Sequence, residues 1–194
     1  MSRKKRAPAK SNIPAMLIFG SGLILLGLAA FIAWPRTDSN ANIPVPEESS
    51  PALAAVNYPA PGLELSDLDG VEHSLTDYLG SVVLVNLWAT WCPPCKAEMP
   101  TLESYYQTHQ ADGFVTIAIN DGDPDDAVIA FVNEYKLSFP VWLDPTYQAT
   151  DNAFKTRNLP SSFVIDREGN IRLRWVGEID RDSLEKYVTP LLFE

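Results

Sequence analysis

The chain contains only two cysteines, Cys92 and Cys95, and they follow closely on a nearly continuous apolar run at residues 82–88. An apolar run of this length predicts a strand that is covered on both faces. Apolar side chains spaced by three and four residues predict that the next segment, 93–110, is a helix. The sequence therefore places a Cys-x-x-Cys pair between the end of a buried strand and the first turn of a helix.

This position favours dithiol chemistry at the two cysteines. Unpaired backbone N–H groups and the positive end of the helix dipole stabilise a thiolate on Cys92 and lower its pKa. A spacing of two residues brings both sulfurs close enough for a reversible disulfide. Pro93 and Pro94 lack an N–H group, which the first turn of a helix tolerates, and they stiffen the loop.

Three other uses of a Cys-x-x-Cys pair fit the sequence less well. A zinc site needs two more ligands, and the only histidines, His73 and His109, do not have ligand spacing. Haem attachment requires a histidine directly after the second cysteine, where this chain has Lys96. A purely structural disulfide remains an alternative, although closing so short a loop gains little chain entropy.

Charge divides the chain into two parts. Residues 1–36 hold six of the 15 basic residues and none of the 25 acidic ones. The remainder is strongly acidic and would repel a phosphate backbone, so we expect no nucleic-acid partner.

The first part predicts a membrane anchor. Residues 13–34 contain 22 residues without a charge, and a helix of that length spans about 33 Å, enough to cross a bilayer. The basic segment 1–12 should remain in the cytoplasm and the rest of the chain should lie outside. Residues 35–57, rich in proline, predict an extended linker. A cleaved signal peptide is the alternative, but no good cleavage site follows the apolar run at the right distance.

Residues 58–194 have the size of one α/β domain. Segments 63–65 and 71–75, separated by Asp69-Gly70, predict a hairpin. The order of elements predicts a central mixed, partly parallel sheet with helices on both faces. Further strands are expected at 114–120, 141–143, 163–166 and 171–176, and the last two should form a hairpin around residues 167–170. Further helices are expected at 125–136, 147–155 and 180–189, the last of them capped by Asp180.

Four aspartates between residues 121 and 126 resemble a calcium-binding loop. However, Pro124 interrupts the series, and Val132 stands where an EF-hand needs a bidentate glutamate. Acidic residues at a helix start stabilise its dipole, and we expect this simpler role.

Two segments carry a resemblance to a known family. Residues 85–100 read VNLWATWCPPCKAEMP, and residues 159–166 read LPSSFVID. These runs resemble the thioredoxin superfamily, and more narrowly the membrane-anchored TlpA/ResA/CcmG-type thiol–disulfide oxidoreductases. The resemblance covers residues 58–194, extends to the anchor, and implies a thioredoxin-like fold.

The resemblance implies roles for individual residues. Cys92 would attack a substrate disulfide, and the more buried Cys95 would resolve the mixed disulfide. Pro160 would be cis and would face the cysteines, aligning a substrate strand and preventing metal capture. Trp91 would shape the substrate surface, with core packing as the alternative. Glu98 would tune the thiols or relay protons, with an exposed helix carboxylate as the alternative.

The sequence departs from the wider superfamily at two positions. Asn86 stands where cytoplasmic thioredoxins carry a buried acid, so no proton relay can pass through it, and Glu98 becomes more important. Leu159 precedes the proline where many relatives carry Thr or Val, which leaves substrate preference open. Pro93 and Pro94 occur between the cysteines of relatives but do not identify a substrate.

Together these features predict an enzyme, a membrane-tethered reductase of disulfides in exported proteins. By resemblance, a transmembrane thiol donor would supply its electrons, and apocytochrome c would be a substrate. The alternatives are an oxidase or isomerase of exported proteins, a reductase that keeps copper-site thiols reduced or assists metal delivery, and a non-catalytic module. A peroxidase is disfavoured because a cysteine pair, not a lone cysteine, opens the helix. We expect neither a metal nor a cofactor.

Overall fold

The computed structural model describes residues 52–194. The predicted basic segment, the membrane span and most of the linker, residues 1–12, 13–34 and 35–51, lie outside the described residues. Within residues 52–194, no helix combines the length and apolar character needed to cross a bilayer.

The described part is built on one eight-stranded sheet with the strand order β1-β8-β7-β4-β5-β6-β2-β3. The pairs β4–β5 and β5–β6 are parallel, and the other neighbouring strands are antiparallel, so the predicted mixed sheet is confirmed. The strands are β1 (Ala52–Pro59), β2 (Glu64–Asp67), β3 (Glu72–Ser74), β4 (Val82–Trp88), β5 (Phe114–Asn120), β6 (Val141–Leu143), β7 (Ser161–Ile165) and β8 (Asn170–Val176).

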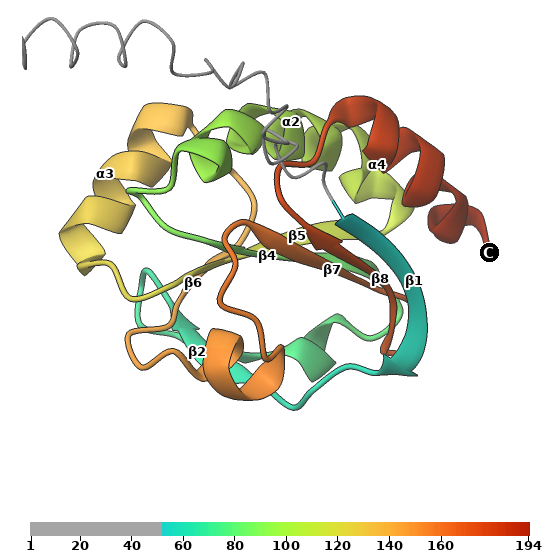
Figure 1. Ribbon diagram of the computed structural model, residues 1–194, viewed down its shortest axis with the longest axis horizontal. Coiled ribbons are helices and arrows are strands. Elements are labelled where there is room, and N and C mark those ends of the chain that lie inside the picture. The colour runs from blue at the N-terminus through green and yellow to red at the C-terminus, as the bar shows by residue number, and fades with distance from the viewer. Residues whose placement is uncertain (1–51) are drawn as a thin grey trace, which may run out of the picture. The chain divides into compact units, whose positions relative to one another are not determined.

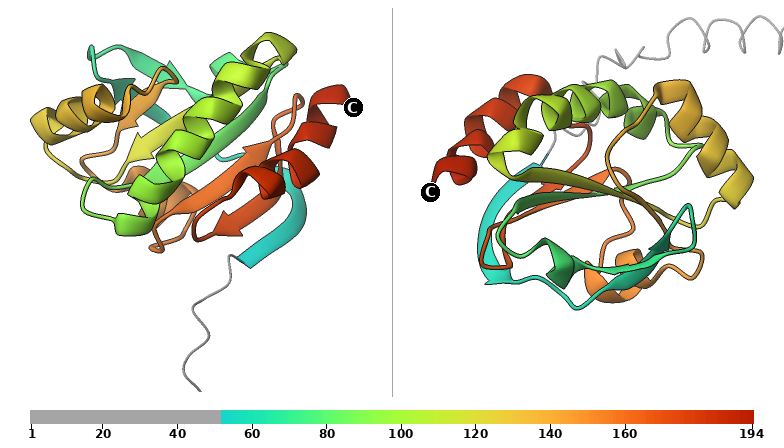
Figure 2. Two further views of the ribbon diagram at one scale, coloured as in Figure 1. Left: turned by 90° about the horizontal axis from the view of Figure 1, so that it is seen from above. Right: turned by 180° about the vertical axis from the view of Figure 1, so that it is seen from behind.

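The three α-helices, α2 (Pro93–His109), α3 (Asp125–Tyr135) and α4 (Arg181–Tyr187), cover one face of the sheet (Figures 1 and 2). Because β4, β5 and β6 follow one another in the same direction across the sheet, right-handed crossovers must place α2 and α3 on the same face. The prediction of helices on both faces therefore holds only in part. The second face is covered by the 3₁₀-helix η1 (Leu75–Tyr78), the π-helix η3 (Gln148–Ala153) and the β2–β3 hairpin.

Every residue of β4 is buried, as its apolar run predicts. Its side chains alternate between two cores. Leu84 and Trp88 pack beneath α2, whereas Val83 and Leu87 pack on the opposite face. Asn86 lies on the α2 side because it is two residues from each of Leu84 and Trp88. The strand thus delivers one polar side chain into the core beneath the helix.

The first strand corrects the predicted linker boundary. Residues 52–57, assigned above to the linker, belong to β1, which pairs with β8 from Ala52↔Val176 to Pro59↔Asn170. β1 is the edge strand of the sheet, and an edge tolerates proline because one side of the strand needs no ladder hydrogen bond. Leu53 of this stretch also packs against the core beneath the helices.

Two hairpins and a helix cap agree with the sequence predictions. β2 and β3 pair around Asp69-Gly70, and β7 and β8 pair around a turn in which Gly169 has φ of 84°. Asp180 caps α4 because its side chain accepts a hydrogen bond from the backbone N–H of Ser183 at 2.7 Å. The weak helix predicted at 147–155 is the π-helix η3.

The packing of β4 leads to a stability prediction. Leu84→Ala should lower the free energy of unfolding by about 2–5 kcal/mol, because it leaves a cavity beneath α2 at a fully buried position. Ile129→Ala on the exposed side of α3 is the control and should change the free energy by no more than about 0.5 kcal/mol. Urea unfolding curves measure both, and equal losses would contradict the two-core description.

Candidate active site

Cys92 and Cys95 form a disulfide at the start of α2. Cys92 is the N-cap residue, and its Sγ accepts a hydrogen bond from the backbone N–H of Cys95 at 3.3 Å. Pro93 and Pro94 occupy the first helical positions, as their missing N–H groups allow. Cys92 is 3% exposed and Cys95 is fully buried. The order of accessibility is therefore the one expected for an attacking and a resolving cysteine.

The surface beside Cys92 is apolar. Trp91 is 67% exposed, so the alternative that it packs in the core is wrong. Pro93 and Pro94 are also exposed. An exposed indole next to a reactive sulfur provides contact area for an incoming polypeptide.

The Leu159–Pro160 peptide bond is cis, as the resemblance implies. Ser161 of β7 pairs with Leu87 of β4, so Pro160 lies at the carboxyl end of β4, where the chain leads into the cysteine loop. Its carbonyl accepts a hydrogen bond from the N–H of Gly177 at 2.9 Å. Leu159 is half-buried and packs against both cores. The pairing of β7 with β4 thus brings residues 159–160 to the same end of the sheet as the cysteine loop.

Glu98 is fully buried, so the alternative of an exposed helix carboxylate is wrong. It lies three residues after Cys95 on α2, and this spacing puts both side chains on one face of the helix. Its Oε1 accepts a hydrogen bond from Asn86 Nδ2 at 2.7 Å, and its Oε2 accepts one from the backbone N–H of Ile179 at 3.0 Å. Burial raises the pKa of Glu98 to about 8, against the two hydrogen bonds, which lower it. The carboxyl group therefore titrates in the range in which thiols exchange.

Asn86 connects Glu98 to β7. The same Nδ2 atom donates a second hydrogen bond, to Ser162 Oγ at 2.9 Å. Ser162 stands opposite Asn86 in the β4–β7 ladder. Neither Ser162 nor the Ile179 N–H was predicted from the sequence, because only the pairing of strands far apart in the chain brings them to Glu98.

Asp123 holds the loop that leads to Cys92. Its Oδ2 accepts hydrogen bonds from the backbone N–H of Thr90 at 2.6 Å and from Asn120 Nδ2 at 2.9 Å. Asp125 and Asp126 lie in the first turn of α3, as expected for acids that stabilise a helix dipole. Asp123 does not share that role. The signal that could have found it is its position after β5, since β4 and β5 are parallel and end at the same edge of the sheet.

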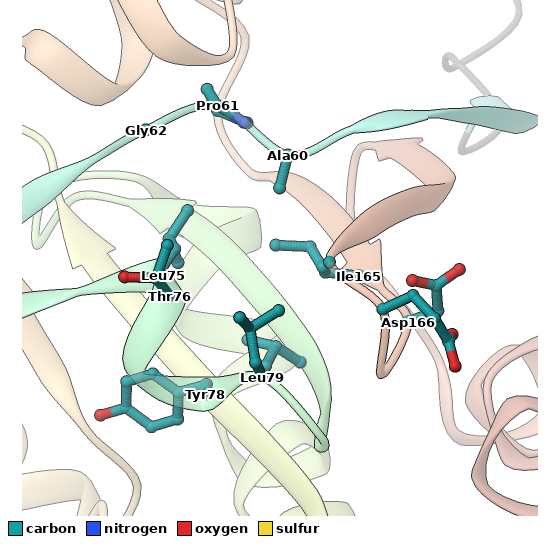
Figure 3. Close-up of a pocket in the computed structure, with 12 residues that line it drawn as sticks. Ala60, Pro61, Gly62, Leu75, Thr76, Tyr78, Leu79, Ile165 and Asp166 are labelled. Carbon is teal, nitrogen blue, oxygen red and sulfur yellow. The ribbon is translucent and has the colours of Figure 1, made fainter.

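A cavity of about 140 Å³ lies away from the cysteines, at the amino end of β4. Leu75, Leu79 and Ile165 line it, with the carboxylate of Asp166 at one side (Figure 3). Val83, near the start of β4, also lines it, whereas the cysteine loop follows the other end of that strand. Among residues 52–194, no group of three or more His, Cys, Asp or Glu side chains is arranged to hold a metal ion.

The contact of Asp123 with the loop can be tested by hydrogen exchange. Asp123→Ala should abolish protection of the Thr90 amide and lower the free energy of unfolding by about 1–3 kcal/mol, because a backbone donor loses a charged acceptor. Asp126→Ala, in the first turn of α3, is the control and should leave the Thr90 amide protected. Retained protection in Asp123→Ala would show that other contacts hold the loop.

The raised pKa of Glu98 predicts a dependence of stability on pH. Its folded-state pKa lies above the usual 4.5, so the stability contributed at low pH is lost as the pH rises from about 4.5 to about 8 and then levels off. The slope from this group approaches about 1.4 kcal/mol per pH unit. Glu98→Gln has no such titration, and urea unfolding of the disulfide form at a series of pH values gives the difference. Parallel curves for the two proteins would contradict the burial of an ionisable Glu98.

Comparison with known proteins agrees with this geometry. The AhpC/TSA family profile matches residues 56–174. Two proteins named thiol–disulfide oxidoreductase ResA are each 37% identical to the chain. For the protein from Geobacillus thermodenitrificans the match spans 137 residues, 71% of this chain and 78% of that protein. For the protein from Bacillus anthracis it spans 132 residues, 68% and 76%.

Solved structures give the same result for the fold. A Chlorobium tepidum protein assigned as the thiol:disulfide interchange protein DsbE has a TM-score of 0.65 and 31% identity, over 73% of this chain and 99% of that chain. A second Chlorobium tepidum structure, a thiol:disulfide interchange protein of the thioredoxin family, has a TM-score of 0.63 and 28% identity, over 72% and 99%. The predicted thioredoxin-like fold is confirmed. The chain belongs to the AhpC/TSA family and is a thiol–disulfide oxidoreductase of the ResA/DsbE type.

Proposed function

We propose that this oxidoreductase works as a reductase of disulfides in exported proteins. The observation that carries the proposal is the Cys92–Cys95 disulfide at the start of α2, with the buried carboxyl group of Glu98 on the same helix face. The helix start stabilises a thiolate, and the carboxyl group can accept a proton inside the protein.

The reaction begins from the dithiol. The Cys92 thiolate attacks one sulfur of the substrate disulfide and expels the other as a thiolate, forming a mixed disulfide. Cys95 then loses its proton, and its thiolate attacks the Cys92 sulfur and expels the remaining substrate sulfur. The substrate gains two electrons and becomes a dithiol, while the enzyme becomes the Cys92–Cys95 disulfide.

Glu98 is the group in this scheme that takes the proton of Cys95. Cys95 is fully buried, so its thiol needs an acceptor inside the protein. A carboxyl group with a pKa of about 8 is matched to a thiol and can release the proton again in the next cycle. Asn86 cannot serve as this acceptor because an amide does not titrate.

The surroundings of Cys92 supply the substrate surface in this proposal. Exposed Trp91 and the prolines Pro93 and Pro94 offer apolar contact, and Leu159 with cis-Pro160 lies at the same end of the sheet. An unfolded polypeptide whose cysteines are oxidised can bind such a surface in an extended conformation.

The apolar run near the N-terminus supports the location in this proposal, and the family resemblance supports the partners. Residues 13–34 anchor the protein in the cytoplasmic membrane, residues 1–12 lie in the cytoplasm, and the domain lies outside, tethered by the linker. A transmembrane thiol donor regenerates the dithiol, and apocytochrome c before haem attachment is a substrate. This assignment rests on the resemblance to the TlpA/ResA/CcmG type. The alternatives are that the same cysteines run in the oxidising direction, as an oxidase or isomerase, or that they reduce a disulfide formed by copper-site thiols.

The reduction potential separates a reductase from an oxidase. We expect the full chain, titrated in thiol/disulfide buffers and assayed by alkylation, to have a midpoint below about −230 mV, near thioredoxin. A value above about −180 mV would contradict the proposal and favour an oxidase or isomerase. Cys95→Ser provides the matched control for the resolving step. This variant keeps Cys92 but cannot resolve the mixed disulfide with a substrate protein, so the covalent complex should accumulate on a non-reducing gel.

A further inference from the structure

Asn86 makes an unusual set of hydrogen bonds for a fully buried amide. One atom, Nδ2, donates to both Glu98 Oε1 and Ser162 Oγ, at 2.7 and 2.9 Å. The other end, Oδ1, is buried and has no hydrogen-bond partner among residues 52–194. The amide therefore concentrates its contacts at one end and leaves the other end unsatisfied, which costs free energy.

A half-turn of the amide exchanges Nδ2 and Oδ1 without changing the shape of the side chain. Oδ1 would then lie between Ser162 and Glu98 and would need a donor from each. The serine hydroxyl can rotate to donate, but Glu98 can donate only when its carboxyl group is protonated. One end of the Asn86 amide lacks a partner in either orientation, so the free-energy cost of the unsatisfied end is similar in both. The two orientations differ in whether they suit a protonated or an ionised Glu98.

The position of that proton is also restricted. Glu98 Oε2 faces the backbone N–H of Ile179 at 3.0 Å, a donor that cannot rotate. A proton on Oε2 would oppose it, so the proton belongs on Oε1, the oxygen that faces Asn86. The other groups around Glu98 do not change which oxygen carries the proton. Ser162 of β7 is neutral, and Cys95 lies on the same helix as Glu98. The carboxylate of Glu178, before α4, disfavours a second negative charge at Glu98.

We propose that Asn86 is a positioning residue whose amide turns with the charge of Glu98, donating to the carboxylate and accepting from the carboxylic acid. The buried carboxyl group then has a partner both before and after it takes the proton of Cys95. A fixed amide would leave two donors facing each other in the protonated state. The inference rests on the proposed function, in which Glu98 carries that proton.

The test is NMR of the full chain in its disulfide form, with ¹⁵N-labelled asparagine and ¹³C-labelled glutamate, from about pH 5 to about pH 10. We expect the cross-peak between the Asn86 side-chain N–H and the Ser162 β-protons above the midpoint of Glu98, and its loss below it. The Asn86 amide shifts and the Glu98 carboxyl shift should share one midpoint. A cross-peak that is unchanged on both sides, or a Glu98 of constant charge, would overturn the proposal.

Two controls make the result specific. Asn120 is buried like Asn86, but its Nδ2 donates to Asp123 and its Oδ1 accepts from the Asp123 N–H, so its amide is fixed and its cross-peaks should not change. In Glu98→Gln no carboxyl proton exists, and the Asn86–Ser162 cross-peak should be the same at all pH values. A change that persists in this variant would assign the turn to another group and overturn the proposal. The measurement needs no substrate, so its failure is distinct from a failure of the reductase assignment.

Discussion

Burial of β4 on both faces is the constraint on which the rest of the structure depends. All seven of its residues are buried, so the strand needs helices on one side and the η1, η3 and hairpin layer on the other. Its carboxyl end leads into the cysteine loop, and α2 returns over the same strand. The alternation of its side chains puts Asn86 under α2, where it bonds Glu98. Fold and site are therefore consequences of one buried strand.

In the proposed function, the site also keeps a charge change inside the protein. Isolated buried carboxylates are costly, and here burial raises the pKa of Glu98 although two hydrogen bonds oppose the rise. Those hydrogen bonds come from β4 and from the segment before α4. The strand β4, the helix α2 and the segment before α4 thus fix the position of the Glu98 carboxyl group. Dithiol exchange releases protons, so in the proposed function this placement links the fold to the chemistry of the cysteines.

The family assignment and the geometry of the site answer different questions about this protein. The relatives establish the fold and the thiol–disulfide activity. The hydrogen bonds show how this chain arranges a neutral amide and a buried acid, where cytoplasmic thioredoxins carry a buried acid on the strand. The tie from Asp123 to Thr90 adds a support for the cysteine loop from the neighbouring parallel strand. Both features depend on pairing across the sheet.

The sequence by itself determined the buried strand, the Cys-x-x-Cys helix start, the two hairpins and the mixed sheet, because local periodicity and turn residues specify them. It also identified Glu98 and the proline at 160 through the resemblance. Tertiary structure decided what depends on distant segments. Pairing with β8 turned residues 52–57 into a strand, and crossover handedness put the α-helices on one face. The partners of Glu98 come from residues 86, 162 and 179, which meet only when β4, β7 and the segment after β8 lie side by side, and no local pattern encodes that contact.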